Sequence, residues 1–525
     1  MPEERTSILH AAVQKALPMP GMGAIAMRIF FLMRSSIYLR NYESVVRLLA
    51  ANGHEVHLGF SKIDPVFSED AVAQLVDENS NISYAILPIR DWLWRRPAEF
   101  VRKLQTYVRF LDERYKDTHK LKARAESLVP KRFRNLLQVT IGSSDPKRWA
   151  LIEFLRNLER AIPLNPFTVR YLKKQQPDVF LITPLVNLKA KQLDWLKSAK
   201  SLGIKSGLCV ASWDNLTSKS LIQSEPDLVF VWNEIQKREA LEFHHIPASK
   251  IVVTGAQCYD RLFAHRPSTS GKAFLEKVGL EQEEPYLLYL CSSAFIAPRE
   301  VEFISEWIER LRSSGDTRLE RIGVLVRPHP QNSAQWNEVD FTHFHNVSIF
   351  PRRGAAPIRG QSFNDFYDSM FHSFATVGIN TSPMIESGIL NKPVFTILAP
   401  QFKDTQEGTI HFAHLVEGGL LNVSHDLDEH VRQLIKVLDG EETYHERIRE
   451  FIQSFVRPHG MQKECTPLFV KALEDLNNGM MAPTADRAKW GFLIRASLFP
   501  WAAVYFTYSR VKERMTGWFA RTPIE

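Results

Sequence analysis

Polar side chains replace apolar ones at a predicted strand end in the second half of the sequence. The stretch "VGINTSPMIESGILNKPVFTIL", residues 377–398, passes from an apolar segment into Asn380, Thr381 and Ser382 and then into a predicted helix. The start of a helix exposes unpaired backbone N–H groups and the positive end of its dipole, and small side chains let an anion approach. Glu386, one turn later, can accept hydrogen bonds from ribose or sugar hydroxyls. The structural alternatives are that Thr381 only caps the helix and that Glu386 is only solvated.

Two further predicted strands in the same half end in residues suited to phosphate. "VLVRPHP" places Arg327 and His329 directly after an apolar run, and "YLCSSAF" places Ser292 and Ser293 after another. A guanidinium matches the geometry of phosphate oxygens, and histidine supplies a hydrogen-bond donor or a proton. We therefore predict a donor-binding set that consists of Ser292, Ser293, Arg327, His329, Asn380, Thr381, Ser382 and Glu386.

Carboxylates in the first half are candidates for a general base that activates an acceptor hydroxyl. Glu43 follows the small-residue turn "RSS" near a predicted helix start, where a capping carboxylate is the alternative. Asp214 in "SWDNLTSK" lies between Trp213 and Asn215 after an apolar segment. An indole, a carboxylate and an amide together are suited to holding a sugar. His57 lies inside a strand pattern, which favours a structural histidine.

Glu43 and Asp214 are thus the predicted catalytic residues. The predicted acceptor-binding set is Arg40, Asn41, Trp213, Asn215 and Lys219. Contact of the lysine with a donor phosphate, or with water alone, stays open. We predict no metal site, because the only Asp-x-Asp motif, residues 426–428, opens a predicted helix and is explained by capping.

Short apolar strands alternate with amphipathic helices along most of the chain, which is typical of parallel α/β domains. One series runs from "RIFFLM" to "KIVVTG", and a second runs from "PYLLYLCSS" to "KPVFTIL". The two series predict two Rossmann-like domains with a turn-rich link near residues 264–284. Because α/β sheets bind ligands beyond the carboxyl ends of their strands, we expect a ligand cleft between the domains.

The expected organisation begins with an extension, residues 1–26, that lacks the apolar core of a secretory signal. The remaining expected parts are an acceptor domain at 27–265 with a helical insertion at about 95–176, a nucleotide-sugar domain at 284–440, C-terminal helices at 441–480, and an amphipathic tail at 485–525.

Basic residues are concentrated in the predicted insertion. Between Arg90 and Lys174 there are 21 lysines and arginines against 9 aspartates and glutamates, an excess larger than the net charge of +7 of the whole chain. Anionic lipid, a phosphorylated substrate, nucleic acid and a merely solvated helical face are open explanations, although no zinc-finger or RNA-binding signature accompanies the patch.

The tail "WGFLIRASLFPWAAVYFTYSRVKER" is rich in aromatic residues, but Arg495 and Pro500 interrupt its apolar runs. The uninterrupted apolar run is therefore too short to span a bilayer, while attachment to a membrane surface and packing against the protein's own body both stay open. The four cysteines are widely spaced without a CxxC pair, so we expect neither a disulfide framework nor a zinc cluster, and a reducing cytoplasm fits.

The motifs of the second half resemble the nucleotide-sugar half of the GT-B glycosyltransferases. This fold is shared with the non-hydrolysing UDP-GlcNAc 2-epimerases and the CDP-glycerol glycerophosphotransferases. "GINTSPMIESGILNKPVFTI" is similar to the element in which small residues hold a diphosphate and a Glu binds a sugar hydroxyl, although Asn391 stands here in place of Gly. "YLRNYESVVRLLAANGHEVHLGF", "ASWDNLTSKS", "VWNEIQKREALEFHHIP" and "VVTGAQCYDRLF" resemble bacterial surface-carbohydrate proteins of this group, over roughly residues 27–475.

The resemblance implies that the second domain holds a nucleotide-diphosphate sugar as a substrate and that the first binds a saccharide or lipid-linked acceptor. It implies a metal-independent glycosyltransferase of surface polysaccharide or glycolipid synthesis, without a cofactor or a nucleic-acid partner. The expected location is the cytoplasm, with the inner face of the membrane as an open alternative. A CDP-polyol phosphotransferase and a non-catalytic nucleotide-sugar-binding protein are the alternative functions.

Overall fold

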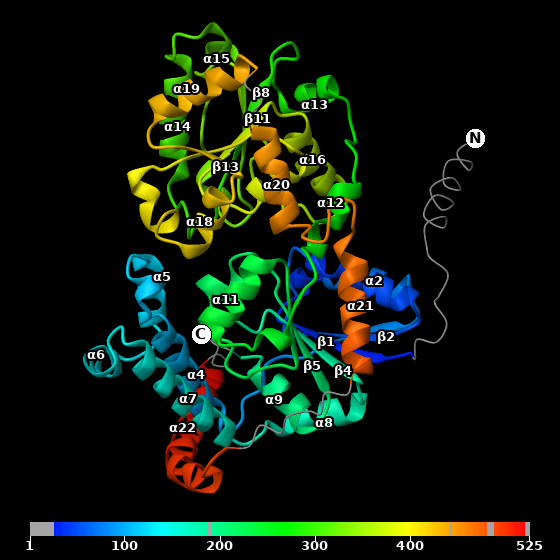
Figure 1. Ribbon diagram of the computed structural model, residues 1–525, viewed down its shortest axis with the longest axis vertical. Coiled ribbons are helices and arrows are strands. Elements are labelled where there is room, and N and C mark those ends of the chain that lie inside the picture. The colour runs from blue at the N-terminus through cyan, green and yellow to red at the C-terminus, as the bar shows by residue number, and fades with distance from the viewer. Residues whose placement is uncertain (1–25, 187, 189–190, 441–443, 480–487, 520–525) are drawn as a thin grey trace.

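The computed structural model of the protein describes residues 26–186, 188, 191–440, 444–479 and 488–519. The predicted extension therefore lies outside the described residues except for Ala26, as do residues 485–487 and 520–525 of the predicted tail. Two parallel sheets with helices packed on them form two domains that are stacked along the long axis of the molecule (Figure 1).

The first domain has a seven-stranded parallel sheet in the order β3-β2-β1-β4-β5-β6-β7. Its strands are β1 (Arg28–Met33), β2 (Glu55–Phe60), β3 (Ile82–Ile86), β4 (Val179–Thr183), β5 (Lys205–Cys209), β6 (Leu228–Val231) and β7 (Ile251–Val253). The central strands are continuous apolar runs such as "VFLIT", in which every residue is buried. A parallel sheet covered on both faces requires this composition, and two apolar clusters, one on each face, form the core.

The helices of the first domain lie between successive strands of its sheet or follow the last strand, β7. They are α2 (Glu43–Ala51), α3 (Glu69–Asp77), α4 (Arg95–Arg109), α5 (His119–Glu126), α6 (Lys131–Thr140), α7 (Asp145–Ala161), α8 (Pro166–Gln175), α9 (Leu193–Ser201), α10 (Asn215–Ser218), α11 (Glu234–His244) and α12 (Asp260–Ala264), with the 3-10 helices η1 (Ser36–Asn41), η2 (Glu113–Tyr115), η3 (Ala248–Lys250) and η4 (Gln257–Tyr259).

The second domain has a six-stranded parallel sheet in the order β10-β9-β8-β11-β12-β13. Its strands are β8 (Tyr286–Leu290), β9 (Gly323–Arg327), β10 (Val347–Ile349), β11 (Ala375–Gly378), β12 (Val394–Ile397) and β13 (Leu421–Ser424). Its helices are α13 (Gly271–Val278), α14 (Glu300–Arg312), α15 (Thr317–Arg321), α16 (Gly360–Phe371), α17 (Pro383–Ile389), α18 (Ile410–Glu417), α19 (Leu427–Leu438) and α20 (Tyr444–Phe455), with η5 (Ser333–Trp336) and η6 (Pro400–Thr405). The link near residues 264–284 contains α13, which packs on this sheet.

The predicted fold class is confirmed: two Rossmann-like α/β domains, a helical insertion in the first domain, and a helical tail, α22 (Gly491–Phe519). The Asp-x-Asp motif has the predicted structural role. Asp426 caps α19 by accepting a hydrogen bond from the backbone N–H of Glu429 at 2.7 Å. Asp428 forms an ion pair with Arg310.

Part of the positive charge of the insertion, α4 to α8, lies inside the protein. Arg102 and Arg148 are almost fully buried, and each is paired with carboxylates: Arg102 with Glu159 at 2.8 Å and with Asp194, Arg148 with Asp112 at 2.8 Å. A buried cation is tolerated when it is paired and hydrogen-bonded. The basic composition of the insertion is therefore only partly a surface property.

The chain returns to the first domain at its C-terminal end. After α20, which packs on α17 of the second domain, α21 (Cys465–Asn478) lies along α2 of the first domain (Figure 1). Asp260 fixes the start of α21 by accepting hydrogen bonds from the backbone N–H groups of Cys465 and Thr466 at 3.1 and 2.7 Å. Gly255 lies against this start, where a Cβ atom would be 2.3 Å from the Cys465 sulfur. The last helix before the tail thus completes the first domain.

Replacing Leu473 by Ala tests whether α21 forms part of the core of the first domain. The Leu473 side chain is fully buried in the core that also contains the strands of the first sheet. We expect L473A to lower the free energy of unfolding by about 2–5 kcal/mol, because the substitution leaves a cavity. Denaturant unfolding followed by tryptophan fluorescence measures the change. Lys471 of the same helix is 73% exposed, and K471A should change the stability by less than about 0.5 kcal/mol. Equal effects of the two variants would contradict the packing of α21 in the first domain.

Candidate functional site

The carboxyl ends of strands from both sheets meet at the boundary between the domains. Trp213 follows β5, and its indole N–H donates a hydrogen bond of 3.1 Å to the hydroxyl of Ser382, which follows β11. Arg40 on η1 follows β1, and its charge acts on both His329, after β9, and Glu386, on α17. Residues predicted separately for the acceptor and the donor sets therefore lie on one interdomain boundary.

Glu386 is a half-buried carboxylate that faces the first domain. Burial raises its pKa to about 7, and the Arg40 guanidinium opposes this rise. Burial raises the pKa of Cys258 and Tyr259, and the charge of Glu386 adds to the rise, so η4 lies close to Glu386. Within the described part of the chain, no hydrogen bond or ion pair engages this carboxylate. It is therefore available to a ligand hydroxyl.

His329 presents a hydrogen-bond donor at the same boundary. Its Nδ1 accepts a hydrogen bond of 3.1 Å from the backbone N–H of Gln331. Burial and the nearby Arg40 lower its pKa to about 4, so the imidazole is neutral at pH 7. With Nδ1 acting as the acceptor, the proton of the neutral ring lies on Nε2.

Three residues hold the Asp214 carboxylate in position: Asn215 and Ser218 of α10, and Lys219, which directly follows this helix. The carboxylate forms an ion pair of 3.0 Å with Lys219 and accepts hydrogen bonds from the Ser218 hydroxyl at 2.8 Å and the Asn215 amide at 3.1 Å. Although burial opposes it, Lys219 and His411 hold the pKa of Asp214 well below its usual range. The group is therefore ionised at neutral pH, and it is a weak base while the ion pair lasts.

Arg327 reaches the same sheet edge, but its side chain turns toward α16. Arg327 and Gly378 are both in register with Leu290, so their Cα atoms are separated by two strand spacings, about 10 Å. The residue is 5% exposed, and its guanidinium donates a hydrogen bond of 3.3 Å to the Asp365 carbonyl and lies over the Phe366 ring. Its Nη2 atom is buried without a partner, and burial lowers the pKa of Arg327 to about 10. No contact joins it to Thr381 or Ser382 within the described part of the chain.

The start of α17 is not capped in the way that the sequence suggests. Ser382 is the N-cap residue and Pro383 follows it, but no side chain accepts a hydrogen bond from the helix. Ser382 has helical rather than extended backbone dihedrals, φ −58° and ψ −35°, and its hydroxyl accepts a hydrogen bond from Trp213. The Thr381 side chain is buried and forms no hydrogen bond with another described residue, while its carbonyl accepts one of 3.1 Å from the backbone N–H of Met384.

Several predicted site residues are engaged in structural contacts. Glu43 bridges the domains through ion pairs with Arg47 of its own helix at 3.0 Å and with Arg359 of the second domain at 2.8 Å. The Asn380 amide donates to the Thr405 carbonyl at 2.6 Å and so anchors η6. Ser292 is fully buried, and its backbone N–H donates to Glu300 at 2.8 Å.

The remaining predicted residues lie near the boundary or in the first sheet. The Asn41 amide donates to the carbonyl of Ala211 at 2.9 Å, which ties η1 to the end of β5. Ser293 is half-buried after β8 and forms no side-chain hydrogen bond among the described residues. His57 lies on β2, where its ring bonds with Ser83 at 2.8 Å and Tyr171 at 2.7 Å, as a structural histidine does.

Two residues at the boundary were not among the predicted set. His411, at the start of α18, packs edge-on against Trp213 with ring centroids 4.8 Å apart, and burial lowers its pKa to about 4. Arg124 of α5 donates a hydrogen bond of 2.7 Å to the Ser218 carbonyl and lies 4.8 Å from the ring of Phe295 in the second domain. The sequence "GTIHFAH" contains a histidine after a turn, which could have indicated a site residue at His411. No feature of the sequence distinguishes Arg124 from the other basic residues of its helix.

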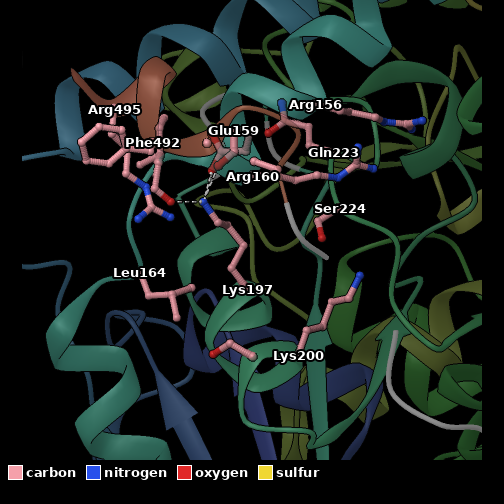
Figure 2. Close-up of a pocket in the computed structure, with 14 residues that line it drawn as sticks. Arg156, Glu159, Arg160, Leu164, Lys197, Lys200, Gln223, Ser224, Phe492 and Arg495 are labelled. Carbon is pink, nitrogen blue, oxygen red and sulfur yellow. Dashed lines mark hydrogen bonds and ion pairs between the residues drawn. The ribbon is translucent and has the colours of Figure 1, made fainter. Parts of the chain in front are cut away.

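A cavity of about 450 Å³ lies in the first domain beneath the start of α22, away from the boundary residues. Figure 2 shows side chains of α7 and α9 and the residues Phe492 and Arg495 around it. Lys197 is engaged there by Glu159, at 3.0 Å to its carboxylate. Among the described residues, no group of three or more histidines, cysteines or carboxylates has the arrangement of a metal site.

Solved structures of UDP-GlcNAc 2-epimerases and of glycosyltransferases are similar to the chain in overall architecture. They include UDP-GlcNAc 2-epimerase from Neisseria meningitidis bound to UDP-GlcNAc (13% identity, 85% of this chain and 99% of that chain, TM-score 0.47) and the lipopolysaccharide glycosyltransferase WaaG (10% identity, 86% and 100%, TM-score 0.44). The glycosyltransferase of kitacinnamycin is a third (12% identity, 86% and 99%, TM-score 0.48). No protein-family model and no curated protein sequence matches the chain. The function proposed below therefore rests on the chain's own residues.

Replacing Glu386 by Gln tests its raised pKa. Because the folded protein holds the Glu386 proton more tightly than the unfolded chain does, the stability of the wild type relative to E386Q is highest below about pH 4.5 and declines as the pH rises toward about 7. We expect a decline of about 1–3 kcal/mol, measured by urea unfolding between about pH 4.5 and pH 8. E302Q, which removes an exposed carboxylate of α14, is the control for a lost surface charge. A difference that does not vary with pH would show that Glu386 is not desolvated.

Proposed function

We propose that the chain is a metal-independent glycosyltransferase that moves a sugar from a nucleotide-diphosphate donor to a saccharide or lipid-linked acceptor of a surface polysaccharide or glycolipid. The second domain takes the donor, and the first domain takes the acceptor. The proposed place of action is the cytoplasm. The donor is a substrate, and the reaction needs no cofactor.

The buried Arg327 guanidinium is the observation that carries this proposal. A buried cation is costly unless a charge or several hydrogen bonds compensate it. Arg327 has one long hydrogen bond to a carbonyl, and its neighbour Asp365 is engaged by Lys277 and by Gln361 at 2.6 Å. The contrast with the carboxylate-paired Arg102 and Arg148 indicates that Arg327 is kept for an anion that arrives with the ligand.

The donor diphosphate is the anion that suits the surroundings of Arg327. The turn at Thr381 and Ser382 follows β11, which is separated from the strand of Arg327 by β8, and its backbone amides add donors at the same sheet edge. Breaking the bond between the anomeric carbon and the diphosphate leaves negative charge on the leaving oxygen. A guanidinium and fixed amides stabilise that charge without a metal ion, because they are already oriented before the reaction.

Glu386, His329 and Arg40 are suited to the sugar and nucleoside part of the donor. The free carboxylate accepts hydrogen bonds from hydroxyl groups, and the Nε2–H of the neutral imidazole donates one. Arg40 comes from the first domain and lies close to both. Donor binding therefore involves residues on both sides of the boundary.

The acceptor side is formed around Asp214. The buried Trp213 indole fixes the start of this segment through Ser382 and His411, and Lys219 and Asn215 hold the carboxylate in one orientation. An ionised carboxylate is the state in which a base accepts the proton of the attacking hydroxyl. We propose that the acceptor hydroxyl approaches Asp214 and that contact of Lys219 with the donor phosphate weakens the ion pair and raises the basicity of Asp214.

A thermal-shift screen with UDP-, GDP- and CDP-linked donors tests donor binding. We expect one nucleotide class to raise the melting temperature of the wild type and R327A to lose at least about tenfold in affinity, because a charged hydrogen-bond partner is removed. R321A is the matched control, since Arg321 lies in the same domain and is 64% exposed. Binding of CDP-polyol donors alone would favour the phosphotransferase alternative. Equal binding by R327A and R321A would refute the role of Arg327.

Replacing Asp214 by Asn separates donor binding from transfer. We expect D214N to keep the thermal shift with the donor and to lower the transfer rate by at least about a hundredfold, because the proton acceptor is lost. Transfer of a radiolabelled sugar to a membrane-lipid or polysaccharide extract measures the rate. E43Q serves as the comparison, because Glu43 is held by Arg47 and Arg359. If D214N transfers the sugar as fast as the wild type, or if E43Q loses more of the transfer rate than D214N does, Asp214 is not the catalytic base.

A further inference from the structure

Large apolar side chains are exposed mainly in one part of the described molecule. Eleven of the fifteen large hydrophobic residues that are exposed there lie on α6, α7, the turn before α8, and the segment from Trp490 to Tyr505. The most exposed are Val139 at 87%, Phe492 at 81% and Trp490 at 77%. Their concentration distinguishes this region from ordinary surface, where single apolar residues are scattered.

The exposed residues of α6 and α22 belong to one continuous surface. Phe133 of α6 packs edge-on against Phe100 of α4 with ring centroids 5.2 Å apart, and Phe100 packs against Trp501 of α22 at 5.5 Å. α22 also packs along α4 and α7, and Figure 1 shows these helices side by side. We call this surface the apolar–basic face. It consists of Phe133, Leu136, Val139, Leu164, Trp490, Phe492, Leu493, Phe499, Val504 and Tyr505, with the exposed cations Lys131, Arg132, Lys489 and Arg495.

One side of α22 is used to hold it on the protein, and the other is left in water. Leu498 and the fully buried Ala502 pack into the cluster formed by α4 and α7. At about 100° per residue, Phe492, Leu493, Phe499 and Val504 fall within one arc of about 140° on the opposite side. The helix is thus fixed in place by its inner side and presents a row of apolar side chains outward.

The charges around the apolar–basic face are positive. Neither α6 nor the stretch 491–507 contains an aspartate or a glutamate. The nearby carboxylates of α5 and α7 are each paired with an arginine: Glu126 with Arg134 at 3.0 Å, Asp145 with Arg148, and Glu153 with Arg156. The cavity beneath the start of α22 is lined by five basic side chains against the single carboxylate of Glu159 (Figure 2), which adds positive potential on this side.

We infer that the apolar–basic face docks the protein on the surface of a bilayer that contains anionic lipid. Aromatic and aliphatic side chains enter the boundary between head groups and acyl chains, and the surrounding cations attract the lipid phosphates. None of the described helices has both the length and the apolarity to cross a bilayer, so the contact is one with the membrane surface. The inference is independent of the reaction proposed above, since it uses none of the boundary residues.

Vesicle co-sedimentation of the full chain tests the inference. We expect the wild type to bind vesicles of phosphatidylcholine with about 30 mol% phosphatidylglycerol, and to bind vesicles of phosphatidylcholine alone at least about tenfold more weakly. Salt should weaken the binding, because it screens the cations. The variant F492S/L493S/F499S should lose at least about tenfold in binding to the anionic vesicles, since it removes inserted apolar area.

A second variant and a control keep the test independent of folding. K131E/R132E/K489E reverses exposed charges and should also lose at least about tenfold in vesicle binding. V66S/I89S removes exposed apolar residues elsewhere on the first domain and should bind like the wild type. Circular dichroism checks that each variant is folded.

The inference is overturned if the wild type does not sediment with anionic vesicles, or if both variants bind as well as V66S/I89S. It is also overturned if light scattering shows a dimer that F492S/L493S/F499S abolishes while vesicles bind none of the proteins. In that case the face is a contact between two copies of the chain.

Discussion

The parallel direction of the strands in both sheets is the constraint on which the candidate site depends. Parallel pairing brings the carboxyl ends of all strands of a sheet to one edge. In this chain the Trp213–Ser382 bond joins the loop after β5 of one sheet to the loop after β11 of the other, and the charge of Arg40, after β1, acts on His329, after β9. Short segments that are hundreds of residues apart in the sequence are therefore neighbours without any long loop.

The partners of the buried arginines distinguish structural charges from a charge that is kept for a ligand. Arg102 and Arg148 are buried against carboxylates, and Arg109 donates to a row of main-chain carbonyls near α10. Such cations hold the insertion on the domain. Arg327 is also buried, but among the described residues it has no carboxylate partner and donates one hydrogen bond, to the Asp365 carbonyl. Desolvation without compensation has a free-energy cost that a protein recovers when an anion binds.

The sequence was sufficient to predict both sheets, because continuous apolar runs separated by amphipathic helices are a local pattern. It also predicted which strand ends carry polar residues. It did not predict the partners of those residues. Glu43 has the sequence context of a free carboxylate, yet Arg359 pairs with it from the second domain. Ser382 has the context of a helix cap, yet its hydroxyl bonds to Trp213. Such contacts depend on how the domains pack, and no local pattern records that.

The return of α21 to the first domain has a consequence for the order of events during synthesis. Phe469 and Leu473 fill the core beside the first sheet, so the domain that leaves the ribosome first lacks part of its interior until nearly the whole chain has been made. The second domain contains all of its strands and α20 before that point. The second domain can thus reach its native packing before the first, and α21 then packs against α2. A ribosome stalled before residue 465 should carry a nascent chain whose leading domain is still open to proteases.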